Sequence, residues 1–204
     1  MQHSRELLGQ GDSMSKLYRK WYSFDMPQTT YRDVVHEIAA DNYGYVTTRA
    51  AERAGVPKVE LVKLATRNRF AHIAYGLYRD ETIPHTPLDE YAEATLRAGE
   101  GAFLRGEAVL ALLGLADVNP RSITVATPKR TRRTVPARIT LTPAPADAKL
   151  TVYEGIAAQS VVDALLECQG RVQAGRLIEA ATRARAEGYL TTAEMSRVRE
   201  AMAA

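Results

Sequence analysis

Apolar residues recur at helical spacing in the first half of the chain, where polar residues separate them. Val34, Val35 and Ile38 share one face of a helix that Thr29 or Thr30 can cap. Short runs of alternating apolar and polar residues follow, with a glycine in the turn between them. This half is predicted to form three helices and then two strands, over about residues 30–41, 47–53, 57–68, 70–73 and 77–79.

The second half of the chain combines helical patterns with short β-branched runs. Pro84 and Pro87 make residues 82–87 a predicted linker. The predicted strands are residues 122–126 and 137–141, on either side of a basic turn at 129–133, and residues 150–153. The predicted helices span about residues 89–98, 106–113, 159–167, 171–187 and 192–202.

These elements predict an α+β chain with two domains. Three short helices followed by a β-hairpin form the plan of a winged helix-turn-helix, whose third helix lies in the major groove of DNA. We therefore expect residues 29–83 to form a winged helix-turn-helix DNA-binding domain. Residues 88–204 are expected to form a mixed α/β C-terminal domain with a small sheet and C-terminal helices, and residues 1–28 an N-terminal extension.

Composition narrows the class of protein but not its activity. The chain has 204 residues, of which 46% are hydrophobic and 25% are charged, and these values are typical of a globular protein. The single cysteine, Cys168, excludes an intrachain disulfide, and no apolar stretch approaches the ~18 residues that a membrane helix needs. The N-terminus lacks the apolar core of a secretory signal, so the sequence predicts a cytoplasmic protein without a membrane partner.

Positive charge is concentrated in two segments, although the net charge of the chain is only +3. Residues 49–79 carry seven basic and two acidic residues, and residues 121–138 carry six basic and no acidic residues. Two local positive fields on a nearly neutral chain favour contacts with polyanions. The alternative is that both segments are ordinary solvated faces.

The predicted helix over residues 57–68 has an apolar face and a mixed face. At 100° per residue, Leu61, Leu64 and Ala65 point the same way and can pack on the two preceding helices. Val59, Lys63 and Thr66 fall opposite, with Val62, Glu60 and Arg67 on the flanks. The valines can contact thymine methyl groups, and Lys63 can reach a guanine or a phosphate. The candidate DNA contacts of this helix are Lys58, Val59, Val62, Lys63, Thr66 and Arg67.

Further candidate DNA contacts flank this helix. The hydroxyls and the first N–H groups of the preceding helix suit a phosphate, and the hairpin can reach the DNA backbone or the minor groove. These candidates are Thr47, Thr48, Arg49, Arg69, His72, Tyr75 and Arg79. The alternative is a protein-docking module in which the tyrosines of the hairpin pack against it.

The second basic segment has two possible partners. It can contact the DNA backbone at a second place, or it can dock on an acidic surface of a protein partner. Charge alone favours neither partner. The basic residues of this segment are Arg121, Lys129, Arg130, Arg132, Arg133 and Arg138.

No local pattern indicates catalysis, a metal or a cofactor. Gly99, Gly101 and Gly106 lack both the preceding strand and the following Gly-Lys-Ser/Thr of a phosphate-binding loop. The four histidines, at positions 3, 36, 72 and 85, lack the spacing of zinc ligands. We therefore expect no catalytic residues, no metal site and no cofactor.

Several runs of residues occur in an order that characterises a known family. They are Gly44-Tyr45-Val46-Thr47-Thr48, Ala54-Gly55-Val56, Asn68-Arg69-Phe70, Gly76-Leu77-Tyr78, residues 106–115 and residues 123–130. In this order, residues 44–164 resemble the AbiEi antitoxins of bacterial type IV toxin–antitoxin pairs. That family often has a serine and further arginines where this chain has Pro57, Lys58 and Val59, so the resemblance implies no particular operator sequence.

The resemblance implies a cytoplasmic bacterial antitoxin that represses its own operon by binding repeats in the promoter. It also implies a C-terminal domain that opposes a nucleotidyltransferase-like toxin, by direct binding or functionally. Two alternatives stay open from the residues: a protein-interaction module that does not bind DNA, and an enzyme that modifies the toxin, for example by phosphoryl transfer.

Overall fold

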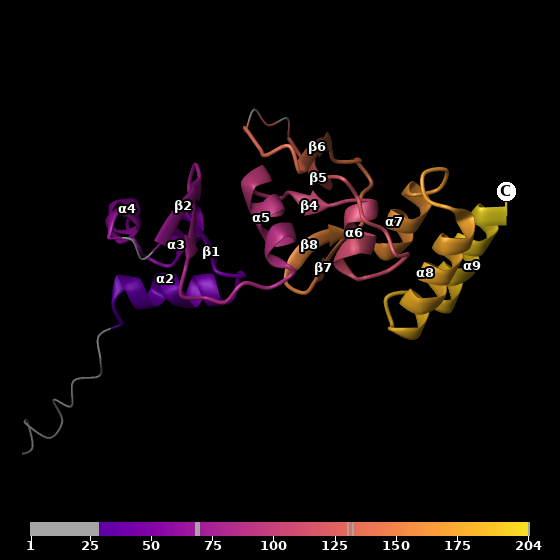
Figure 1. The fold of residues 1–204 in the computed structure, drawn as a ribbon, viewed down its shortest axis with the longest axis horizontal. Coiled ribbons are helices and arrows are strands. Elements are labelled where there is room, and N and C mark those ends of the chain that lie inside the picture. Colours follow the sequence, from indigo (N-terminus) through magenta and orange to yellow (C-terminus); the bar gives the residue numbers. More distant parts are fainter. Residues whose placement is uncertain (1–28, 68–69, 130, 132, 204) are drawn as a thin grey trace, which may run out of the picture.

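Residues 31–80 fold into three helices and a three-stranded antiparallel sheet, which we call the N-terminal unit (Figure 1). The computed structural model describes residues 29–67, 70–129, 131 and 133–203. Strand β3 lies between β1 and β2. In chain order the elements are α2 (Tyr31–Ala40), β1 (Tyr45–Thr47), α3 (Thr48–Arg53), α4 (Lys58–Thr66), β2 (Phe70–Ala74) and β3 (Leu77–Asp80).

Side-chain caps begin two of these helices, as the sequence predicts. Thr30 and Asp33 form a capping box at α2, because each side chain accepts a hydrogen bond from the backbone N–H of the other. The Thr47 hydroxyl accepts a hydrogen bond of 3.1 Å from the Ala50 N–H at α3. Gly44, at φ +84°, supplies the left-handed turn between α2 and β1.

An apolar cluster of its own holds the N-terminal unit together. It joins all three helices to the sheet, and Leu61 of α4 and Val35 of α2 are fully buried in it. Burial of one such aliphatic side chain contributes about 1.5–3 kcal/mol to folding. The buried members are Val35, Val46, Ala51, Val56, Leu61, Phe70 and Tyr78.

A five-stranded mixed sheet forms the centre of the molecule, with the strand order β6-β5-β4-β8-β7. The short central strand β4 (Phe103–Leu104) is antiparallel to β5 (Ile123–Thr127) and parallel to β8 (Ile156–Gln159). Strand β6 (Ile139–Pro143) extends one edge parallel to β5, and β7 (Leu150–Tyr153) extends the other edge antiparallel to β8. We call residues 89–159 the central unit.

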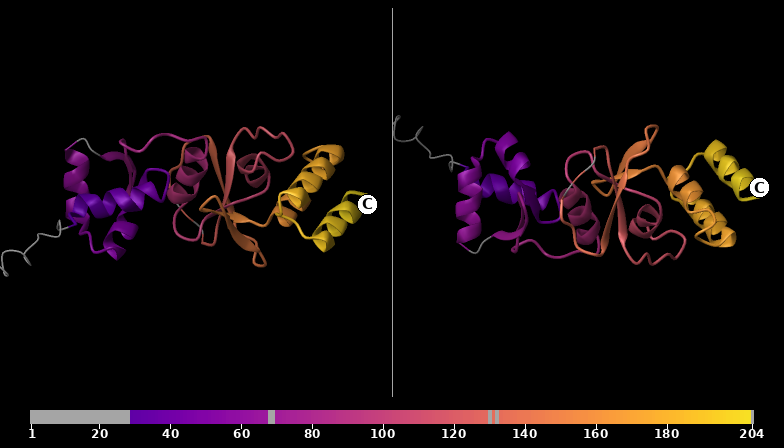
Figure 2. Two further views of the ribbon diagram at one scale, coloured as in Figure 1. Left: turned by 90° about the horizontal axis from the view of Figure 1, so that it is seen from below. Right: turned by 90° about the horizontal axis from the view of Figure 1, so that it is seen from above.

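The described chain is elongated, and its parts lie in a row (Figures 1 and 2). Helix α4 lies at one end, the central unit in the middle, and α8 and α9 at the opposite end. Helices α5 and α6 belong to the central unit, and α7 connects its sheet to the last two helices. The bounds are α5 (Asp89–Ala98), α6 (Glu107–Leu112), α7 (Val161–Glu167), α8 (Ala174–Ala186) and α9 (Thr192–Ala203).

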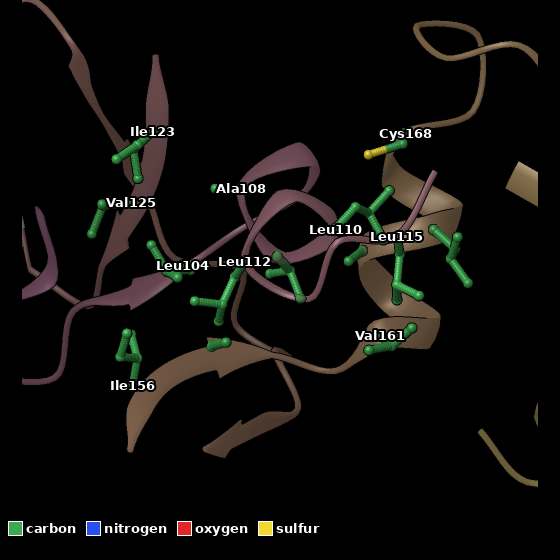
Figure 3. Close-up of a cluster of buried hydrophobic side chains, with 14 of the residues drawn as sticks. Leu104, Ala108, Leu110, Leu112, Leu115, Ile123, Val125, Ile156, Val161 and Cys168 are labelled. Carbon is green, nitrogen blue, oxygen red and sulfur yellow. The ribbon is translucent and has the colours of Figure 1, made fainter. Parts of the chain in front are cut away.

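One continuous apolar core joins the central sheet to the C-terminal helices. Figure 3 shows Leu104 of β4, Leu110 and Leu112 of α6 and Val161 of α7 converging on it. Cys168 is buried at the end of α7, where burial raises the pKa of its thiol to about 12. The thiol is therefore a small apolar group in this structure, as its sequence context predicts.

The chain is a mixed α/β protein with helices and two small sheets. The predicted connection between two of its strands is wrong. Strands β5 and β6 are parallel, so the predicted basic turn at 129–133 does not join them as a hairpin. Strands β4 and β8 were not predicted. Glu154 and Gly155 both have positive φ, the geometry of a type I′ turn, and they reverse the chain between β7 and β8.

Among the described residues, no helix is both long and apolar enough to span a bilayer. The predicted N-terminal extension, residues 1–28, lies outside the described residues.

Candidate nucleic-acid interface

Helix α4 divides into a buried side and an exposed side, as the helical wheel predicts. Leu61 is 0% exposed, whereas Val59 is 56% exposed and Val62 is 42% exposed. Leu64 packs against the apolar cluster from the same side as Leu61. Val59 and Val62 therefore leave part of their apolar surface open to solvent on this side of the helix.

Polar groups surround the exposed valines. The Lys63 ammonium lies 2.7 Å from a Glu60 carboxylate oxygen, and both groups are on the surface. The Thr66 hydroxyl donates to the Val62 carbonyl oxygen at 2.9 Å. All six predicted contacts from this helix are exposed: Lys58, Val59, Val62, Lys63, Thr66 and Arg67.

The tip of the β2–β3 hairpin lies beside the start of α4. Tyr75 at the tip is 85% exposed, and the Lys58 ammonium lies 5.9 Å from the centre of its ring. His72 is exposed on β2, where its ring packs 5.1 Å from the ring of Tyr78. The structure therefore places these two hairpin candidates on the same unit as α4, while Arg69 lies outside the described residues.

The predicted phosphate site at the start of α3 is not open. The Thr48 N–H donates to the Gly76 carbonyl oxygen at 2.9 Å, and the Thr48 hydroxyl oxygen is buried without a hydrogen-bond partner. The Thr47 hydroxyl caps the helix by accepting from the Ala50 N–H. Thr48 is therefore removed from the candidate contacts, because the hairpin turn covers it.

Arg79 is also removed from the candidate contacts, because it is only 2% exposed. Its guanidinium lies 3.1 Å from a carboxylate oxygen of Asp89 and donates to the Ile83 carbonyl oxygen. It also lies over the ring of Tyr45, 5.7 Å from the ring centre. Arg79 thus holds β3 to the start of α5, and it does not face solvent.

Asp89 is adapted to this buried pair. Burial by itself raises the pKa of the Asp89 carboxyl, but hydrogen bonds from Thr86, Arg79 and His85 outweigh burial and hold that pKa below its usual value. The carboxylate therefore stays charged opposite the Arg79 guanidinium at neutral pH.

A second buried carboxylate, Glu93 of α5, links the N-terminal unit to the central unit. It accepts hydrogen bonds from the Tyr45 hydroxyl at 3.0 Å, from Arg97 at 2.5 Å and from Arg138 at 2.8 Å. Arg97 also donates to the Ile73 carbonyl oxygen of β2. Burial raises the pKa of the Glu93 carboxyl, but the Arg97, Arg138 and Tyr45 hydrogen bonds lower it to below its usual value.

The second predicted basic surface is only partly free. Arg138 is committed to Glu93, and Arg133 donates to the Arg97 carbonyl oxygen at 3.2 Å while remaining exposed. Arg121 and Lys129 are exposed. Arg130 and Arg132 lie outside the described residues.

Arg49 and Arg53 of α3 contact Glu100, which follows α5. The sequence predicted Arg49 as a DNA contact, whereas the roles of Arg53, Glu93, Asp89 and Glu100 were not predicted. Arg53 and Glu100 are 47 residues apart, Glu93 is 48 residues from Tyr45, and Asp89 is 10 residues from Arg79. The described residues contain no group of three or more histidine, cysteine, aspartate or glutamate side chains that could hold a metal ion.

Comparison with known proteins gives a distant structural likeness and no match in sequence. No family model matches the sequence, and no curated protein matches it. The chain is similar to the crystal structure of the RV2827C protein from Mycobacterium tuberculosis, with 16% sequence identity and a TM-score of 0.43. The match covers 82% of this chain and 70% of the other. A likeness at this level assigns neither a family nor a function.

Proposed function

We propose that the N-terminal unit is a winged helix that binds double-stranded DNA, with α4 as the recognition helix in the major groove. The exposed valine side of α4 carries this proposal. The exposed parts of Val59 and Val62 contribute no hydrophobic stabilisation in water, whereas thymine methyl groups in a major groove would cover them. The order helix, strand, helix, helix, strand, strand supports the proposal, because the β2–β3 hairpin then takes the position of a wing.

We further propose that this DNA is the promoter of the protein's own operon and that the protein is the antitoxin of a toxin–antitoxin pair. The resemblance of residues 44–164 to AbiEi antitoxins supports this part of the proposal. Under it, residues 88–204 oppose a nucleotidyltransferase-like toxin. The protein-docking alternative predicts that the exposed valines bind a protein and that DNA is not bound.

Loss of two cations from α4 tests the DNA proposal. The variant Lys63→Ala/Arg67→Ala should bind the protein's own upstream DNA about 100-fold more weakly, because two charge-assisted phosphate contacts are lost. The slope of log affinity against log salt should fall by roughly 2, one for each phosphate contact. Both quantities are measured by fluorescence anisotropy at several salt concentrations.

The matched control is Arg176→Ala/Arg199→Ala, which removes the same charge from α8 and α9, at the opposite end of the molecule. This control should retain the affinity and the salt slope of the wild type. An equal loss of DNA affinity in both variants would show that the net charge of the protein, and not the position of the two cations, causes the effect. Equal affinity of the wild type for scrambled DNA would refute operator recognition.

A further inference from the structure

Glu100 is held between two arginines of the N-terminal unit. One of its carboxylate oxygens lies 2.6 Å from Arg53 Nη2, and the other contacts the Arg49 guanidinium. The two arginines are one helical turn apart on α3, so both side chains can contact the same anion. All three side chains are at least 60% exposed, so water reaches the whole cluster.

The turn that carries Glu100 belongs to the central unit. Glycines on both sides of Glu100 have positive φ, +112° at Gly99 and +72° at Gly101. The Arg133 guanidinium packs against Gly99, where an added Cβ atom would lie 3.2 Å from it. Three guanidinium groups therefore gather around this turn.

This cluster adjoins the proposed DNA surface. Arg49 follows Thr48, whose N–H donates to the Gly76 carbonyl oxygen at the tip of the β2–β3 hairpin. Tyr75, beside Gly76, lies near Lys58 at the start of α4. The hairpin tip thus connects the residue before Arg49 to the start of α4, and Glu100 is the acidic group paired with Arg49 and Arg53.

We propose that Glu100 occupies, in the free protein, the site of a DNA backbone phosphate between Arg49 and Arg53. The inference rests on the proposed DNA-binding function. A carboxylate and a phosphate both offer paired oxygens to the guanidinium group, so that one can replace the other at the same two arginines.

Displacement of Glu100 by a phosphate is energetically reasonable. Exposed carboxylate–guanidinium pairs contribute little to stability, whereas a phosphate contact releases condensed counterions from the DNA. Glu100 is therefore an internal competitor that weakens DNA binding. DNA that displaces it also breaks a contact between the N-terminal unit and the central unit.

Removal of the competing charge tests the inference. Glu100→Gln should bind the upstream DNA about tenfold more tightly than the wild type at low salt, with a steeper salt dependence, because both arginines become free for phosphate. Arg49→Gln/Arg53→Gln should then weaken binding more in the Glu100→Gln background than in the wild type.

The matched control is Glu187→Gln, which breaks an exposed pair of 2.8 Å with Arg183 on α8. It removes the same charge far from the proposed surface and should leave the affinity unchanged. If the wild type binds its upstream DNA and Glu100→Gln binds equally well, or no better than Glu187→Gln, the inference is wrong and the proposed function stands. If the wild type binds no DNA at low salt, both fail.

Discussion

Replacement of Val62 with glutamate is expected to abolish operator binding without loosening the fold. Val62 lies on the flank of the exposed side of α4 and is 42% exposed. A carboxylate there would be buried against negatively charged DNA with no cation opposite it. We therefore expect at least a 100-fold loss of affinity. Glutamate is a good helix former, so the free energy of unfolding should stay within about 0.5 kcal/mol of the wild type.

Ile178→Glu provides a matched control for this prediction, because Ile178 is a β-branched residue on α8 with 37% exposure. It should bind DNA like the wild type. Urea unfolding and anisotropy on the same samples separate the two effects. Wild-type affinity in Val62→Glu would place the DNA elsewhere on the molecule, and cooperative unfolding at much lower urea would show that Val62 supports the fold.

Replacement of Arg79 with alanine is expected to destabilise the protein by about 3–5 kcal/mol, because it leaves the buried Asp89 carboxylate without its cationic partner. The substitution also removes the guanidinium that packs against Gly44 and over Tyr45. The free energy of unfolding, measured with urea, is the readout. Arg79→Lys should recover only part of the loss, because a single ammonium nitrogen cannot reproduce both the Nη1 hydrogen bond to the Asp80 carbonyl oxygen and the Nη2 contacts to Asp89 and Ile83.

The exposed Arg67 supplies the comparison for Arg79. Arg67→Ala should change the free energy of unfolding by less than about 0.5 kcal/mol and weaken DNA binding. A stable Arg79→Ala variant with weakened DNA binding would contradict the structural role assigned to Arg79. Arg79 would then again be a candidate DNA contact.

Local signals in the sequence predict much of the N-terminal unit. Thr30 and Thr47 cap helices where the sequence places them. Counting 100° per residue places Leu61 on the buried side of α4 and Val59 on the exposed side. These features depend on residues within about one turn of the same helix. A pattern read along the chain can therefore detect them.

The features that sequence analysis missed depend on contacts between distant residues. Strand β4 has two residues and is defined by its partners β5 and β8. Arg79 looks like any other cation of the hairpin until Asp89 is placed against it. Glu100 likewise gains its position from Arg49 and Arg53, about 50 residues earlier in the chain.

The central claim is that the exposed side of α4 enters a DNA groove, and cleavage from a chelate attached to that helix tests it most directly. Thr66→Cys places a thiol at the exposed end of α4, and the buried native Cys168, with its raised thiol pKa, should stay unmodified. An iron chelate on this thiol should cut the bound upstream DNA at a few adjacent base pairs, whereas the same chelate on Arg176→Cys should not. Bound DNA that the Thr66 chelate cuts no more than the Arg176 chelate does would contradict the claim.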